Sequence, residues 1–298
     1  RLNFGSDLMK ASGLHIVGHL EGYFEPVVMH DEYGEVHFYL VPFAEPSIVR
    51  NVFGDESITS HEGAMARIIE EIELTLDPEK RNIIVGHAFI TKDGMPEQNT
   101  SDSERKLTIG GTECINSALF EPFCYTALGH LHQAHFVANE KIQYAGSPLK
   151  YSESEVTHKK GFLIVDLKED GSVTVEKKLL TPIRDMRIVS GLLDDILQHE
   201  KNDDYVFVKL QDENYVKGAA ELVRTVYQNA LHIERTVVYE RLEQQANTMN
   251  RVQMDDSELF ELFYTEMTGK PLSEETKAIY TDILQQLIDN EREFQEVL

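Results

Sequence analysis

A continuous apolar run in the first third of the chain constrains the fold more than any other feature. Residues 82–90 read NIIVGHAFI, in which β-branched side chains follow one another without polar alternation. Such a run is typical of a strand that is buried on both faces, as in a sheet covered by other layers. The same reasoning predicts further strands at residues 37–43, 125–128, 142–144 and 162–167.

One helix is predicted over residues 60–76, between the strands at 37–43 and 82–90. Its apolar side chains recur at helical spacing at Ala64, Ile68, Ile69, Ile72 and Leu76. Residues 91–112 are polar and punctuated by glycine and proline, which predicts a long loop of the kind that is often functional. Strands mixed with few helices favour an α/β fold with layers and a sheet-rich core.

The pattern changes after residue 180. Helical and strand segments then alternate, at 194–200, 205–210, 219–230 and 232–239, which predicts a small separate α+β domain. A polar stretch at 244–252 follows as a linker, and two amphipathic helices end the chain. The apolar face of this helical hairpin must pack on its own domain or on a partner, and the sequence leaves both readings open.

Composition excludes several classes of protein. The 298 residues carry 28 basic and 52 acidic side chains, so the net charge is −24. This charge argues against a stand-alone basic DNA binder, but not against a nuclease whose metals or partner supply positive charge. Two cysteines make no disulfide framework, and no apolar run is long enough to span a membrane. The start at Arg1, without an initiator Met or a signal segment, leads us to expect a truncated cytoplasmic protein.

Three histidines are the strongest candidates for chemistry. His87 ends one predicted strand and follows a glycine, and His130 and His132 follow Gly129 at the end of another. Residues two apart on extended backbone point the same way, so both can reach one metal centre. Two alternatives stay open here: plain surface histidines, and a three-histidine zinc site with an open position. A two-metal phosphoesterase would also need bridging carboxylates, and Asp-x-His, Gly-Asp-x-x-Asp and Gly-Asn-His-Asp/Glu are all absent from these residues.

The stretch from Ser101 to Glu155 resembles the SbcD family, the nuclease subunits of bacterial SbcC–SbcD complexes. The matching segments keep the family's order and spacing, and the resemblance extends, more weakly after residue 190, over essentially the whole chain. These segments are SDSER (101–105), IGGTE (109–113), ALGHLHQ (127–133), YAGSPLKYS (144–152) and HKKGFLIVDL (158–167). One departure is Glu153, where the family often has an aromatic residue.

The resemblance implies a metallophosphoesterase sandwich that binds two divalent metal ions, usually Mn²⁺. By this resemblance His87 and His130 would bind one ion and His132 the other. The family's first three motifs, including the one with the catalytic histidine, would lie upstream of Arg1. The resemblance therefore implies a partial sandwich, and we expect poor metal affinity and little or no nuclease activity for this fragment alone.

The resemblance also implies an organisation and partners. Residues 1–180 would form the metallophosphoesterase core without its N-terminal part, and 181–243 a capping domain that faces DNA. Residues 253–298 would be the helical hairpin that docks on an SbcC-type, SMC-like ATPase. The implied function is hydrolysis of phosphodiester bonds at double-strand ends and hairpins in DNA repair. Family dimers exist, and their contacts largely involve the part that is absent here.

Two other functions remain as alternatives. One is a metallophosphoesterase that acts on another substrate, which would share Gly-His-x-His but would not need the capping domain and the hairpin. The other is a catalytically inactive, truncated scaffold that only binds the ATPase.

Overall fold

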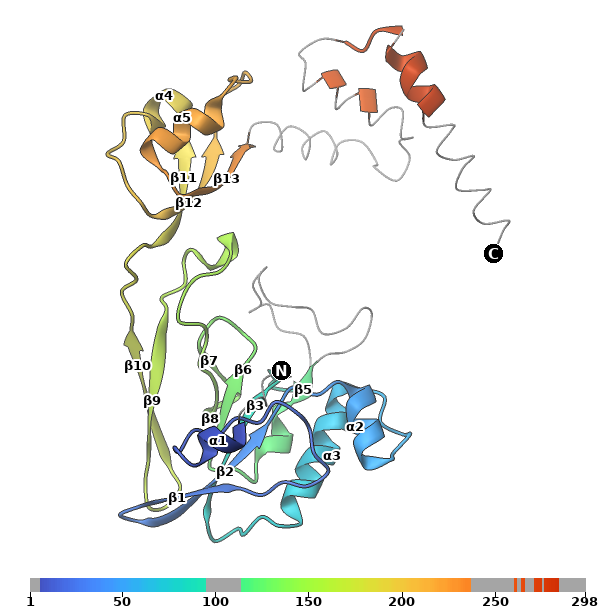
Figure 1. Ribbon diagram of the computed structural model, residues 1–298, viewed down its shortest axis with the longest axis vertical. Coiled ribbons are helices and arrows are strands. Elements are labelled where there is room, and N and C mark those ends of the chain that lie inside the picture. Colours follow the sequence, from blue (N-terminus) through green and yellow to red (C-terminus); the bar gives the residue numbers. More distant parts are fainter. Residues whose placement is uncertain are drawn as a thin grey trace. The chain divides into compact units, whose positions relative to one another are not determined.

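The chain divides into two compact units, Arg1–Ile183 and Arg184–Leu298 (Figure 1). The computed structural model describes residues 6–94 and 114–236, and near the C-terminus residues 260–261, 264–265, 271–274 and 276–283. The two units are described separately below.

A six-stranded sheet forms the centre of the first unit. Its inner strands β2, β3, β6 and β8 are parallel, and antiparallel strands β1 and β7 flank them at the two edges. In spatial order the strands are β1 (Val27–Asp31), β2 (Gly34–Val41), β3 (Arg81–His87), β6 (Tyr125–Gly129), β8 (Asn139–Tyr144) and β7 (His135–Val137). The parallel arrangement brings the carboxyl ends of β3 and β6 to one edge of the sheet.

Two helices cover one face of this sheet (Figure 1). α2 (Pro46–Phe53) begins with proline and ends at Gly54, whose φ of 64° is the left-handed conformation common after a helix. α3 (His61–Glu73) begins where the Ser60 side chain accepts a hydrogen bond from the Gly63 N–H. The predicted helix is therefore confirmed. Its buried face packs on the sheet with Ala64, Met65, Ile68, Ile69 and Ile72.

A two-stranded antiparallel hairpin, β9 (Gly161–Leu167) and β10 (Val173–Leu179), packs on the other face. Because strand side chains alternate between faces, the central strands contribute to both cores. Val36 and Ile83 meet the hairpin's apolar side chains, while Tyr39 and Ile84 join the helix side. The unit is thus an α/β structure of three layers, as the strand pattern predicts.

The predicted strand at 82–90 is interrupted in the structure. β3 ends at His87, and a two-residue strand β4 (Ile90–Thr91) pairs instead with β5 (Ile115–Asn116). The fully buried Tyr144 marks the break, since its hydroxyl accepts a hydrogen bond from the Ile90 N–H at 2.6 Å and donates to the Ala88 carbonyl at 2.9 Å. Sequence patterning alone does not reveal this tertiary contact. The short elements α1 (Ser6–Lys10), η1 (Ser117–Phe120) and η2 (Glu153–Glu155) complete the unit.

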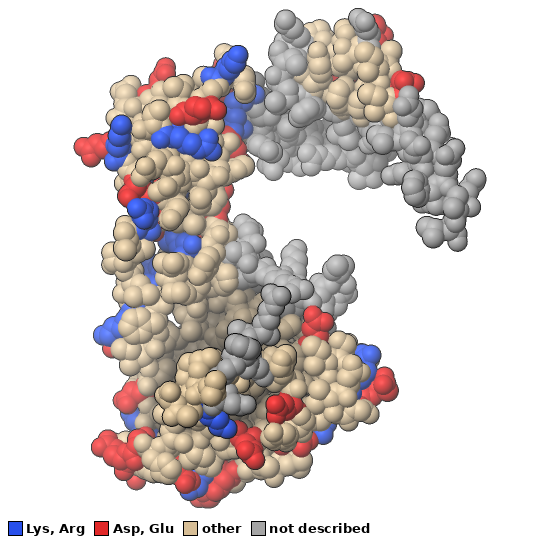
Figure 2. Space-filling model, viewed as in Figure 1, with Lys and Arg blue, Asp and Glu red and all other residues tan. Residues whose placement is uncertain are grey.

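Acidic side chains gather at the amino ends of the parallel strands, where the β1–β2 and β9–β10 turns lie (Figure 2). A hydrogen bond from Tyr33 to Glu32 raises the pKa of the tyrosine, and the charges of Glu169, Asp166 and Asp31 add to this effect. This acidic end is opposite the sheet edge at which β3 and β6 finish.

The described core of the second unit is a three-stranded parallel sheet with two helices. The elements are β11 (Met186–Gly191), α4 (Leu193–Ile196), β12 (Tyr205–Leu210), α5 (Ala219–Val226) and β13 (Ala230–Arg235). The predicted alternation of helix and strand is confirmed. A helix connects each of these strands to the next, and both strand pairings are parallel. The described core therefore consists of two successive βαβ units and not of the predicted α+β arrangement.

Parts of both predicted C-terminal helices are described, and they contact each other. The rings of Phe260 and Tyr280 stack with centroids 3.9 Å apart, and Lys277 pairs with Glu261 at 3.2 Å. The predicted linker at 244–252, most of the loop at 91–112 and the rest of the hairpin lie outside the described residues. Within the described part of the chain, no helix has the length and apolarity needed to cross a membrane.

Candidate functional site

Two of the three candidate histidines are neighbours at the carboxyl edge of the main sheet. β3 ends at His87, which pairs with Gly129 of β6, and His130 follows directly. The ring centroids of His87 and His130 lie 5.4 Å apart. The structure thus places these two strand-end histidines side by side.

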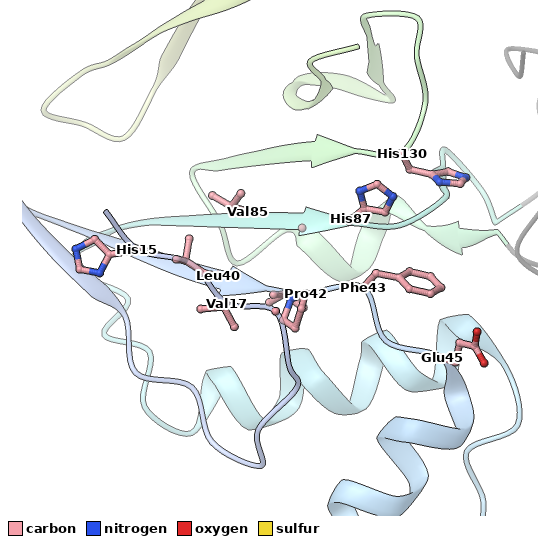
Figure 3. Close-up of a pocket in the computed structure, with 12 residues that line it drawn as sticks. His15, Val17, Leu40, Pro42, Phe43, Glu45, Val85, His87 and His130 are labelled. Atoms are coloured by element: carbon pink, nitrogen blue, oxygen red, sulfur yellow. The ribbon is translucent and has the colours of Figure 1, made fainter. Parts of the chain in front are cut away.

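A cavity of about 680 Å³ opens beside these two rings (Figure 3). Figure 3 shows His87 and His130 together in one region of it and His15 at the far end. Apolar side chains, among them Val17, Leu40 and Val85, line the space between them. Burial lowers the pKa of His87, and the charge of His132 lowers it further. The lowered pKa favours the neutral imidazole of His87, which is the form that binds metal ions.

The close approach of the two rings depends on glycine at position 129. A Cβ atom there would lie 2.9 Å from Nδ1 of His87, which is closer than side chains tolerate. By contrast, a Cβ on Gly86, the glycine before His87, would meet nothing within 4 Å. His130 itself has a φ of 116°, a conformation that L-residues rarely adopt. Strain of this kind persists where surrounding structure enforces it, and it concentrates at functional sites.

His132 is held in a different way, by a buried charge network. Its Nδ1 lies 2.9 Å from Oε1 of Glu155, a carboxylate with no exposed surface. Because an ionised carboxylate only accepts hydrogen bonds, Nδ1 donates to it, and in the neutral tautomer the acceptor lone pair is then on Nε2. A histidine oriented by a carboxylate in this manner is typical of metal ligands.

Lys160 completes the network and is itself buried. Its Nζ donates to Oε2 of Glu155 at 2.6 Å, to Oγ of Ser147 at 2.8 Å and to the carbonyl of His132 at 2.9 Å. Glu155 also accepts hydrogen bonds from the Tyr151 N–H and the Ser152 hydroxyl, both at 3.3 Å. The buried carboxylate and ammonium are thus paired and hydrogen-bonded, as buried charges must be.

These residues fit part of a metal site. Neutral imidazoles suit Mn²⁺, Fe²⁺ and Zn²⁺, and His132 is oriented as a ligand would be. Among the residues that the structure describes, however, no group of three or more His, Cys, Asp or Glu side chains is arranged to hold a metal ion. That all three histidines serve one metal centre stays a prediction.

Sequence reasoning does not identify Glu155 and Lys160 as parts of the site. Both fall in or next to segments that carry the family resemblance, and this position is the one signal that could point to them. Their burial cannot be read from the sequence, because it arises from contacts with the loop around His132 that form only in the folded chain. In the sequence Gly129 is only a glycine that precedes a histidine, whereas in the structure it provides the space that His87 requires.

Comparisons with known proteins identify relatives of this chain. The family model SbcD_C, described as the type 5 capsule protein repressor C-terminal domain, matches residues 182–268. The chain is 32% identical over 295 residues to the SbcD component of the SbcCD nuclease from Staphylococcus epidermidis. This match covers 98% of the chain and 76% of that relative. With this identity over nearly its whole length, the chain belongs to the family of SbcD nuclease subunits.

Proposed function

We propose that this chain is a nuclease subunit that acts with an SbcC-type ATPase. The observation that carries the proposal is the match, over 98% of the chain, to a relative that is named as a component of the SbcCD nuclease. More specifically, we propose that it hydrolyses phosphodiester bonds at double-strand ends and hairpins. We place this activity in the cytoplasm and in DNA repair. The alternatives are a phosphoesterase for another substrate and an inactive scaffold, and the experiments below separate them.

His87, His130 and His132 are the proposed metal-holding residues, for two divalent ions of which Mn²⁺ is the expected kind. When bound, such ions polarise the scissile phosphate and lower the pKa of a water molecule. The chain's own contribution is orientation. Gly129 lets His87 approach His130, and Glu155 with Lys160 turns Nε2 of His132 away from the network.

The activity test uses the natural gene product purified together with the ATPase. We expect Mn²⁺-dependent cleavage of a hairpin-ended duplex, which a chelator stops and His132→Ala lowers more than about 100-fold. His30→Ala is the matched control, since His30 is exposed near the acidic end of the sheet. Cleavage that survives the chelator, or that both variants reduce equally, would contradict the proposal.

Residues 1–298 by themselves should cleave poorly. The three histidines bring no bridging carboxylate, and imidazoles do not offset the repulsion between two cations. We therefore expect less than about 1% of the activity of the natural gene product with the same partner and Mn²⁺. Robust Mn²⁺-dependent cleavage by residues 1–298, lost on His132→Ala, would show that this expectation is wrong.

Residues 1–180 are proposed as the metallophosphoesterase core and 181–243 as a capping domain that faces DNA. The support for the first is the layered sheet with histidines at its carboxyl edge. The support for the second is the family model that matches residues 182–268. A homodimer is also proposed from the family resemblance, and sedimentation of the natural gene product tests it.

The helical hairpin at 253–298 is proposed as the docking element for the ATPase. Among its described residues, Ile279 and Ile283 are 57% and 51% exposed on the same helix. Burying each against a partner would be favourable by roughly 1.5–3 kcal/mol. A partner's apolar helix would therefore find a ready surface here.

The docking test replaces both isoleucines by serine and measures co-purification with the ATPase. We expect loss of co-purification with unchanged thermal unfolding, while Thr281→Ala on the same helix leaves both unchanged. Retained co-purification, together with a large loss of thermal stability, would instead show that the hairpin packs on its own unit.

A further inference from the structure

A second cavity, of about 290 Å³, also borders His132. Loop residues 132–134, 145–147 and 157–161 line it, together with Lys177 of β10. Its ionisable lining groups are all basic or neutral: His132, His158, Lys159, Lys160 and Lys177. None of its twelve lining residues is an aspartate or a glutamate, although the chain has 52 of them.

Lys160 stabilises the wall of this cavity, because its ammonium donates hydrogen bonds to protein groups and not to a ligand. Its ammonium donates to Glu155, to Ser147 and to the His132 carbonyl, and the Glu155 carboxylate balances its charge. The Nδ1 atom of His158 is a further, longer contact at 3.4 Å. The loop that carries His132 is thereby fixed against the start of β9.

Lys159 and Lys177 are in a different position. In the described part of the chain, neither ammonium has a hydrogen-bonded or ion-paired carboxylate, whereas the neighbouring Lys178 pairs with Glu176. Burial lowers the pKa of Lys177, and the charge of Lys160 lowers it further. Two cations therefore border one cavity without a counter-ion from the described residues, which favours an anion there.

We propose that this cavity, defined by Lys159 and Lys177, binds a backbone phosphate of the DNA strand next to the one cleaved at the histidines. The inference rests on the proposed nuclease function. A phosphate is the anion that this substrate presents at regular intervals, and lysine is a common phosphate-binding residue. The cavity shares His132 with the candidate metal site, so one strand can reach both. Elsewhere the acidic chain would repel DNA, and these lysines would hold the strand in register.

The test measures DNA affinity of the natural gene product without metal, so that no cleavage occurs. A labelled duplex with one open end is titrated at several salt concentrations against the unmodified protein and Lys159→Gln/Lys177→Gln. We expect about a tenfold loss of affinity and a salt slope smaller by about 1 for each lysine. Thermal unfolding should not change, because neither lysine pairs with a carboxylate in the described part of the chain.

The matched control removes one positive charge from the same strand, at a position that does not line the cavity. Lys178→Gln removes the same charge from the adjacent position of β10, and we expect less than about a twofold change in affinity relative to the unmodified protein. For the comparison, Lys177→Gln alone should weaken binding at least about three times more than Lys178→Gln. Equal effects of these two single variants would overturn the proposal, because they would reflect net charge alone.

Inorganic phosphate distinguishes a DNA site from a site for the free ion. If the double variant loses binding of inorganic phosphate but keeps its DNA affinity, the cavity is a free-phosphate site and the proposal is wrong. The nuclease function is tested separately. If the complex cleaves DNA normally while both variants bind DNA like the unmodified protein, only the phosphate site fails. If the variants weaken DNA binding but the unmodified complex never cleaves, the proposed function fails and the phosphate site stands.

Discussion

The two sides of the candidate site hold their histidines by opposite means. On one side, His87 and His130 are placed by packing: Gly129 leaves room for the His87 ring, and His130 adopts a strained backbone conformation. On the other side, His132 is placed by charge, through a fully buried Glu155 and its partner Lys160. A shape-based support yields gradually when it is altered, whereas a buried charge pair loses its balance as soon as one partner is removed.

The largest effect should come from breaking the charged side. Glu155→Ala leaves the Lys160 ammonium buried without its carboxylate, and we expect a loss of about 3–5 kcal/mol in the free energy of unfolding. Lys160→Met should cost a similar amount because it leaves the carboxylate buried without its cation. Urea denaturation of each variant measures both.

The double variant Glu155→Ala/Lys160→Met sharpens this test. It removes both charges, so it should be destabilised by less than the sum of the single changes. Removing Glu176 from its exposed pair with Lys178 is the control, with an expected change within about 0.5 kcal/mol. Additive effects at Glu155 and Lys160 would mean that the two side chains do not depend on each other.

An intermediate effect is expected from Gly129→Ala on the packed side. The new Cβ would lie 2.9 Å from Nδ1 of His87, and this ring must move to accommodate it. We expect a loss of about 1–3 kcal/mol in unfolding free energy and a displaced His87 imidazole signal in NMR spectra.

Gly86→Ala is the matched control, since its Cβ would meet nothing within 4 Å. It should leave the His87 signal in place. If both substitutions shift that signal equally, the space at residue 129 is not what positions the ring.

The smallest change in stability is expected at His130, where the usual stability order of alanine and glycine should be reversed. Glycine tolerates a φ of 116°, and alanine does not. His130→Gly should therefore be more stable than His130→Ala by about 1 kcal/mol, the reverse of the usual order in a folded segment. Thermal unfolding of the two variants measures the difference. Alanine equal to or better than glycine would show that His130 is not strained.

Local pattern predicts much of the fold. Strands β2, β6, β9 and β12 and helix α3 are confirmed near their expected bounds, because apolar periodicity and caps such as Ser60 act within each segment. The proximity of His87 and His130 also follows from strand ends alone. The break after β3 does not, since it depends on the Tyr144 hydroxyl, which belongs to a strand far along the chain.

The residues that orient the histidines of the site are the hardest to predict from the sequence. Glu155 and Lys160 are ordinary charged residues in the sequence, and only the folded loop makes them buried partners of His132. The same holds for Lys177 and Lys178, which are adjacent in sequence but have quite different surroundings. Burial and pairing of charges are tertiary properties, and a single sequence carries no periodic signal for them.

The all-parallel sheet of the second unit has a consequence for how the protein is made. Met186 pairs with Tyr205, and Phe207 pairs with His232, in parallel strands. Neighbouring strands of this sheet therefore cannot form a local β-hairpin. Val206 and Val208 on the middle strand, both fully buried, gain their last neighbour only when Ala230–Arg235 is present. On the ribosome the described three-stranded sheet therefore cannot be completed until residues 230–235 have emerged. A chain that stops before residue 230 would leave one edge of the buried middle strand unpaired, and such an edge promotes aggregation.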